Sequence, residues 1–87
     1  MQQRIGAWHR KTFEPPRIIP RIFEKLDEEY HEFTASCKRE EAADIVIVLM
    51  AYADRLGFDL MAEVRKKFAE VEKRTDQVAR DAARGIV

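Results

Sequence analysis

The sequence has few of the residues that interrupt or cross-link a fold. Its single cysteine, Cys37, leaves no partner for a disulfide within the chain, which fits a reducing cytosol. Only three glycines occur, and all three prolines fall in the stretch EPPRIIP, residues 14–20, so the rest of the chain is free to be helical. Acidic and basic residues number 16 each. Without a basic excess, binding to nucleic acid or to an anionic membrane is not expected.

Long apolar runs are also missing. The most hydrophobic segment, residues 42–53, is too short to cross a bilayer and contains Asp44. The N-terminus lacks the apolar core of a signal peptide. We therefore expect a cytoplasmic protein with no membrane partner. The length of 87 residues fits one small domain, residues 1–87.

The abundant residues are helix formers, and 37% of the chain is charged, which predicts an all-α fold. The prolines divide an N-terminal arm, residues 1–19, with a short helix, from a helical body, residues 20–84. Within the body we expect helices over about 21–36 and 38–56, and a long one from Asp59 onward. Their apolar stripes are Ile22, Leu26, Tyr30 and Phe33 on the first, and Leu60, Val64, Phe68, Val71, Val78 and Ala82 on the last. Gly57 and Gly85 are expected to end the second and third of these helices.

The helix over residues 38–56 is apolar around most of its circumference, since eleven of the twelve residues 42–53 are apolar. A chain with three or four helices is too small to cover such a helix on every side. We therefore expect the helical bundle to be completed by oligomerisation, as a homodimer or homotetramer.

Two pairs of carboxylates lie on or beside these apolar faces. Glu29 projects between the apolar residues of its helix, with Glu32 one turn later, and Glu41 and Asp44 have the same spacing. A short turn makes the two helices antiparallel neighbours, so the pairs should face each other. Four carboxylates in a partly dry site need a cation to stay ionised, and oxygen ligands suit Mg²⁺ or Mn²⁺. Alternatively, the glutamates form a solvated edge and Asp44 pairs with Arg55 or with a base of a partner chain.

The motifs EExxE, in LDEEYHEF (residues 26–33), and ExxD, in EAAD (residues 41–44), resemble those of the MazG-like all-α nucleoside triphosphate pyrophosphohydrolases. The segment WHRKTF (residues 8–13) is similar to the phage-type dATP/dGTP diphosphohydrolase branch. KFAEVEKR (residues 67–74) is similar to the family's KxxxNxxR segment. The resemblance spans about residues 8–74.

The resemblance implies Mg²⁺-dependent hydrolysis of a nucleoside triphosphate to the monophosphate and pyrophosphate in a dimer or tetramer. It implies that Glu29, Glu32, Glu41 and Asp44 bind the metal, and that Glu28 is a further ligand or orients the attacking water. Lys67 and Arg74 would neutralise phosphate charge, unless they only pair with Glu63 and Glu70 on their own helix. Two departures are Val71, where the family has Asn, and the short interval of eight residues between Glu32 and Glu41.

Trp8 and Phe13 are candidates for stacking on the base, or else they close the end of the bundle. We expect His9 and His31 to lie at the surface. Phosphoribosyl-ATP pyrophosphatase is the nearest enzymatic alternative, because that family has a similar EEAAD element. A non-catalytic helical oligomer is the alternative from another class.

Overall fold

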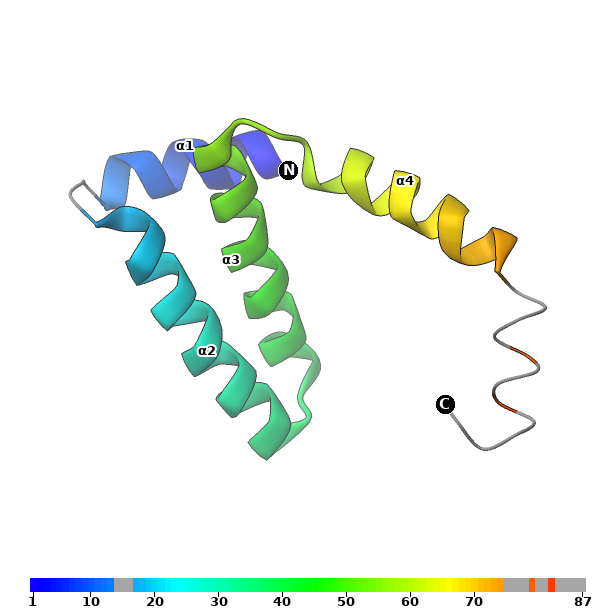
Figure 1. Ribbon diagram of the computed structural model, residues 1–87. Helices are drawn as coiled ribbons and strands as arrows, with labels where there is room; N and C mark the ends of the chain where they lie inside the picture. The colour runs from blue at the N-terminus through cyan, green and yellow to red at the C-terminus, as the bar shows by residue number, and fades with distance from the viewer. Residues whose placement is uncertain (14–16, 75–78, 80–81, 83–87) are drawn as a thin grey trace.

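The computed structural model describes residues 1–13, 17–74, 79 and 82. Within this part of the chain it contains four helices and no strand, so the predicted all-α class is confirmed. The helices are α1 (Gln2–Thr12), α2 (Ile18–Ser36), α3 (Arg39–Leu56) and α4 (Leu60–Lys73). Figure 1 shows α2 and α3 side by side, α1 crossing at one end of this pair, and α4 leading away from it.

The α2–α3 pair is an antiparallel hairpin with a very short connection, as predicted. Cys37 ends α2 in the left-handed conformation, with φ 55°, and its backbone N–H donates to the carbonyl of Phe33 at 2.7 Å. Lys38 follows and α3 begins at the next residue. At the other end of α3, Gly57 has φ 79°, a conformation that favours glycine, and ends the helix where the sequence predicted.

Helix α2 begins at Ile18, a few residues earlier than the sequence predicted. Pro20 therefore lies inside its first turn. A proline is tolerated there because the first N–H groups of a helix have no intrahelical acceptor.

Helix α1 occupies most of the N-terminal arm and packs across α3. Gly6 is buried where the two helices cross. A Cβ atom at this position would collide with the carboxylate of Asp54 on α3. Asp54 also forms an ion pair with Arg10, one turn further along α1. Glycine in the middle of α1 is thus explained by the close approach of α3.

Helix α4 starts as predicted, with Asp59 as its N-cap. The Asp59 carboxylate accepts from the backbone N–H groups of Met61 at 3.0 Å and Ala62 at 3.2 Å. The side-chain amide of Gln2 donates to the carbonyl of Phe58 at 2.7 Å and accepts from the N–H of Leu60 at 2.9 Å. These bonds attach the first residues of α1 to the start of α4.

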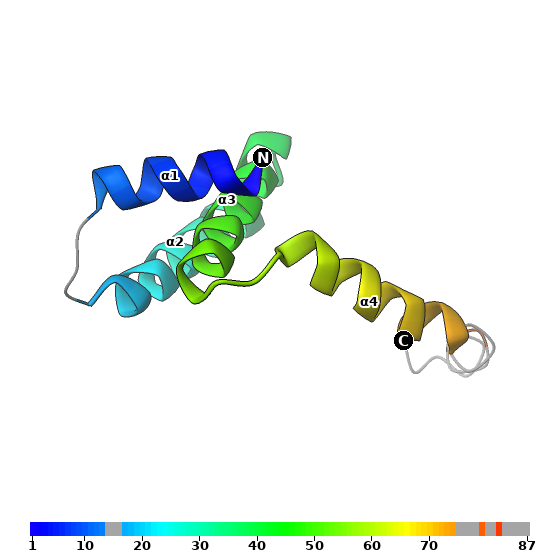
Figure 2. The same ribbon diagram turned by 90° about the horizontal axis from the view of Figure 1, so that it is seen from above.

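Beyond this start, α4 extends away from the other helices, as the view from above shows (Figure 2). None of its residues Leu60–Lys73 is buried. The predicted continuation toward residue 84, including Val78 and the stop at Gly85, lies outside the described residues. None of the described helices is long and apolar enough to span a membrane.

The buried apolar core of the described chain is small. It consists of Ile22, Met50, Ala51 and Ala53. Tyr30, predicted on the apolar stripe of α2, is instead 56% exposed. At 100° per residue it lies roughly 80° round the helix from Ile22, whereas Glu29 lies only about 20° from it. The side of α2 that carries Ile22 faces α3, so Glu29 is buried and Tyr30 is not.

Candidate metal and nucleotide site

Glu29 is the most deeply buried acid of the described chain, with a relative exposure of 5%. One carboxylate oxygen, Oε1, lies 2.9 Å from the ammonium of Lys25, one turn earlier on α2. The other oxygen, Oε2, is buried and has no hydrogen-bond partner among the described residues. A buried carboxylate oxygen left without a donor is costly, so it points to a ligand that this oxygen would bind.

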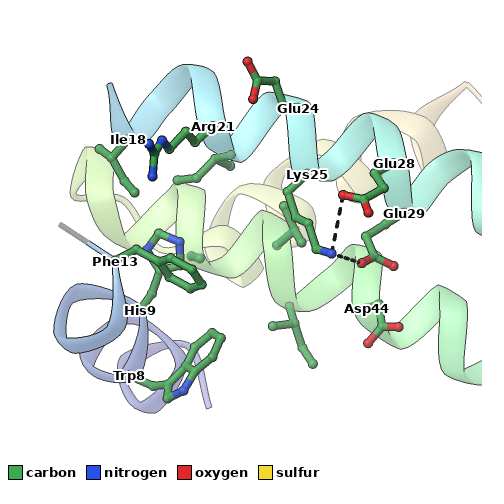
Figure 3. Close-up of a pocket in the computed structure, with 14 residues that line it drawn as sticks. Trp8, His9, Phe13, Ile18, Arg21, Glu24, Lys25, Glu28, Glu29 and Asp44 are labelled. Atoms are coloured by element: carbon green, nitrogen blue, oxygen red, sulfur yellow. Dashed lines mark ion pairs between the residues drawn. The ribbon is translucent and has the colours of Figure 1, made fainter. Parts of the chain in front are cut away.

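Glu41 and Asp44 on α3 lie opposite Glu29. One carboxylate oxygen from each of these three residues falls within 4.8 Å of the other two. Glu41, which is half-buried, also has a buried oxygen without a partner among the described residues, whereas Asp44 is exposed. Figure 3 shows Glu29 and Asp44 on facing helices. The antiparallel hairpin thus brings together three of the four carboxylates that the sequence singled out.

Glu32 lies at the margin of this cluster and is exposed. The charge of Glu29, a hydrogen bond between the Glu32 and Glu29 carboxyl groups and, more weakly, the charge of Glu41 raise the pKa of the Glu32 carboxyl above its ordinary value. The electrostatic field of the cluster therefore reaches Glu32, although its oxygens do not belong to the set of three. Glu28 is also exposed, and its Oε2 lies 3.6 Å from the Lys25 ammonium.

Lys25 was not singled out from the sequence. Its spacing of four residues before Glu29 is a signal that would have found it, because residues i and i+4 are neighbours on a helix. The hydrogen bond to Glu29 is the main cause that raises the pKa of Lys25. The alternative partner considered for Asp44, Arg55, is wrong, since Arg55 binds His9 and the carbonyl of Phe13 instead.

A groove of about 550 Å³ runs from the carboxylates toward α1, between α2 and α3. Trp8 and Phe13 line its far end, with their ring centroids 5.7 Å apart and their planes at 86°. Trp8 is 53% exposed and Phe13 39%, so both rings keep surface open to a ligand. Arg21 and Lys25 line the groove as well, and Figure 3 shows Lys25 beside Glu28 and Glu29 and Arg21 near Ile18 and Phe13. The apolar part of the wall comprises Ile18, Ile22, Ile47, Val48 and Ala51.

His9 is buried beneath this groove, which corrects the prediction of a surface position. Its Nδ1 accepts from Nε of Arg55 at 3.1 Å. The second guanidinium nitrogen of Arg55 donates to the carbonyls of His9 at 3.1 Å and Phe13 at 2.8 Å. Burial, and then the charge of Arg55, lower the pKa of His9. Sequence periodicity missed this because His9 becomes buried only where α1 crosses α3. His31 is exposed, as predicted.

Lys67 and Arg74 are not brought to the groove within one chain. Both lie exposed on or just after α4, and their cationic groups lie 3.5 and 3.7 Å from the carboxylate of Glu70. Pairing with Glu63 and Glu70 is the alternative role that the sequence allows for these two residues. In the structure both of them pair with Glu70. Val71, on the same helix, is 42% exposed.

No protein-family model matches the sequence, and comparisons with curated proteins and with solved structures give no match. The candidate site combines an acidic end, at which Glu29 is buried, with Lys25 beside it and an aromatic end at Trp8 and Phe13.

Proposed function

We propose that the protein is a metal-dependent hydrolase that converts a nucleoside or deoxynucleoside triphosphate to the monophosphate and pyrophosphate, of the MazG-like class. The observation that carries the proposal is the unpartnered, buried Oε2 of Glu29, which faces Glu41 and Asp44 at one end of a groove. Structural ion pairs do not need a carboxylate oxygen left without a donor, whereas a cation site does.

The residues present fit a hard cation. Glu29, Glu41 and Asp44 would hold Mg²⁺ or Mn²⁺ through oxygen atoms alone, and Glu32 is near enough to the cluster to complete the set. When bound, such an ion polarises phosphate oxygens and makes a water molecule more acidic.

The rest of the groove suits a nucleotide. Its volume of about 550 Å³ lies in the usual range of small-molecule sites. Trp8 and Phe13 offer ring faces and edges on which a base can stack. Arg21 and Lys25 also line the groove, with Lys25 beside the acidic end, and their positive charges would suit the phosphates of a bound nucleotide. Arginine binds phosphate with two parallel N–H groups, and lysine contributes a point charge.

The chemical step needs a water molecule in line with the bond that breaks. We assign Glu28 to orient this water, because its carboxylate lines the groove and is exposed. The water oxygen attacks the α-phosphorus, the bond to the bridging oxygen breaks, and pyrophosphate leaves. Glu28 accepts the proton from the water. Little covalent help is needed for such a transfer, and positioning with charge neutralisation accounts for most of the catalysis.

We also propose that the chain works as a homodimer or homotetramer. Only four apolar residues of the described chain are buried, while Phe23, Tyr30, Val46 and Ile47 on the α2–α3 hairpin are exposed by 40–56%. The stripe on α4 is exposed as well, with Phe68 at 58%. Apolar surface on two sides of so small a core is typical of a protein that buries it against a second copy. In such an assembly, α4 of a second chain is the element that would bring Lys67 and Arg74 to the groove.

The proposed activity is tested by incubating the protein with Mg²⁺ and a panel of nucleotides that includes dATP, dGTP and phosphoribosyl-ATP, and by measuring released pyrophosphate. We expect pyrophosphate and the monophosphate in equal amounts, and none from Asp44→Asn. Hydrolysis of phosphoribosyl-ATP alone would instead indicate the pyrophosphatase of histidine synthesis. No product from any nucleotide would favour the non-catalytic oligomer.

A further inference from the structure

Lys25 occupies the boundary between the two parts of the site. Its ammonium lies 2.9 Å from Glu29 Oε1 and 3.6 Å from Glu28 Oε2, and its side chain is about half exposed. Lys25 also lines the groove that leads to Trp8 and Phe13. The lysine stem has four flexible carbons, so the ammonium of a residue that lines the groove is able to turn from the carboxylate into the groove.

The two oxygens of Glu29 are used differently. Oε1 takes the Lys25 ammonium, whereas Oε2 is buried, without a partner among the described residues, and Glu29 belongs to the set shared with Glu41 and Asp44. Without a divalent cation, Lys25 is the charge that neutralises Glu29, and a buried carboxylate needs such a charge. A divalent cation among these three carboxylates would lie a few ångströms from the ammonium and repel it.

We propose that Lys25 is a tethered counter-cation that exchanges partners: it pairs with Glu29 until a divalent metal binds, and then turns into the groove to contact a phosphate group of the nucleotide. This inference rests on the metal site of the proposed function. Lys25 thereby couples the two ligands, because the metal releases the ammonium and the phosphates give it a new partner. Such coupling is reciprocal, so each ligand strengthens the binding of the other.

The exchange predicts a counter-intuitive effect of removing Lys25. In Lys25→Met, the metal no longer competes with a resident cation for Glu29, so Mn²⁺ alone should bind more tightly, by roughly three- to tenfold in Kd. The same variant should have a lower melting temperature without metal, because Glu29 is left buried and uncompensated. The non-hydrolysable α,β-methylene analogue of dATP should improve Mn²⁺ binding to the wild type but much less to Lys25→Met.

The experiment measures Mn²⁺ binding by calorimetry and by the metal-dependent melting temperature, with and without the analogue. Lys66→Met removes an exposed lysine of α4 and is the matched control, which should behave as the wild type. Lys25→Arg keeps the positive charge and should retain both the metal affinity and the coupling to the analogue. If Lys25→Met folds only when Mn²⁺ is added, that result also supports the exchange.

Two outcomes separate the inference from the function on which it rests. If the wild type, Lys66→Met and Lys25→Met all fail to bind Mn²⁺, the metal site itself is wrong. If all three bind Mn²⁺ with equal Kd, or if Lys25→Met binds it more weakly or does not fold at saturating Mn²⁺, the exchange is overturned while the metal site stands.

Discussion

Nε of Arg55 on α3 donates a hydrogen bond to Nδ1 of His9 on α1 at 3.1 Å. Because Nδ1 accepts this bond, it carries no proton, and the imidazole ring is uncharged. Burial and the charge of Arg55 both oppose protonation of the ring and lower its pKa, while Asp54 acts weakly in the opposite direction. The packing of α1, which carries Trp8 and leads into Phe13, thus depends on an uncharged histidine.

Stability should therefore fall as the solution becomes acidic. The folded chain holds His9 neutral to a lower pH than the unfolded chain, whose histidine titrates near 6.5, so the unfolded state takes up the proton first. We expect the melting temperature to be highest above that value and to decrease between about pH 7 and pH 5. His9→Gln should show a shallower decrease over this range, whereas the exposed His31→Gln should keep the wild-type slope. Equal slopes in all three proteins would show that His9 does not carry the effect.

Gly6→Ala should destabilise the fold, because the added methyl group meets the Asp54 carboxylate at the crossing of α1 and α3. The Asp54 carboxylate must turn aside and its ion pair with Arg10 is disturbed, while alanine favours the helix by about 0.5–1 kcal/mol, so we expect a net loss of about 1 kcal/mol in the free energy of unfolding. The measurement is urea unfolding. Gln3→Ala, at an exposed position of the same helix, is the control and should change stability little. An unchanged or higher stability of Gly6→Ala would mean that α1 does not approach α3 so closely.

Millimolar Mg²⁺ or Mn²⁺ should raise the melting temperature of the wild type, because the ion relieves repulsion among Glu29, Glu41 and Asp44 and binds only the folded chain. Asp44→Asn keeps the shape of the side chain but removes its charge. We expect it to lose the response to metal and to melt at an equal or higher temperature without metal. Asp27→Asn, which removes an exposed acid on the same hairpin, should respond as the wild type does. If neither ion changes the melting temperature of the wild type, the metal site is contradicted.

Trp8→Ala should raise KM for the nucleotide by an amount equivalent to roughly 1–3 kcal/mol of lost stacking. Trp8→Phe keeps an aromatic face and should recover most of the affinity. Steady-state kinetics with the best substrate of the panel distinguishes this role from a structural one. If Trp8→Ala leaves KM unchanged but lowers the melting temperature, the ring only closes the end of the bundle against Phe13.

Sedimentation at micromolar concentration should show a dimer or tetramer. Val46→Lys places a charge on an apolar residue of α3 that is 45% exposed, and it should shift the protein toward monomer and lower its stability. Thr34→Lys adds the same charge at an exposed polar position of α2 and should leave the assembly intact. A wild type that is a stable, folded monomer would rule out the oligomer.

Local patterns predicted the elements whose partners are neighbours in sequence. The spacing of apolar residues on α2 and the short interval before α3 were enough to predict an antiparallel hairpin, and hence the approach of Glu29 to Glu41 and Asp44. The cap residues Gly57 and Asp59 marked the end of α3 and the start of α4 correctly.

Features that depend on how α1 crosses α3 escaped prediction. His9 is separated from Arg55 by 46 positions in the chain, and nothing in the periodicity of either segment indicates that they meet. The same holds for Gly6, which reads as a helix breaker until Asp54 is seen beside it. Helix periodicity predicts on which face of its helix a residue lies, but it does not predict the angle at which a helix distant in sequence packs against that face.

The left-handed cap at Cys37 has a consequence for the evolution of this chain. Cys37 and Lys38 are the whole connection between α2 and α3. The number of residues in this connection therefore determines which face of α3 is turned toward α2. An inserted or deleted residue would turn α3 by about 100° and carry Asp44 and Glu41 away from Glu29. Natural selection should therefore remove insertions and deletions in the α2–α3 connection even when every carboxylate is kept. In descendants of this sequence, the distance between the two acidic motifs would be inherited as strictly as the acids themselves.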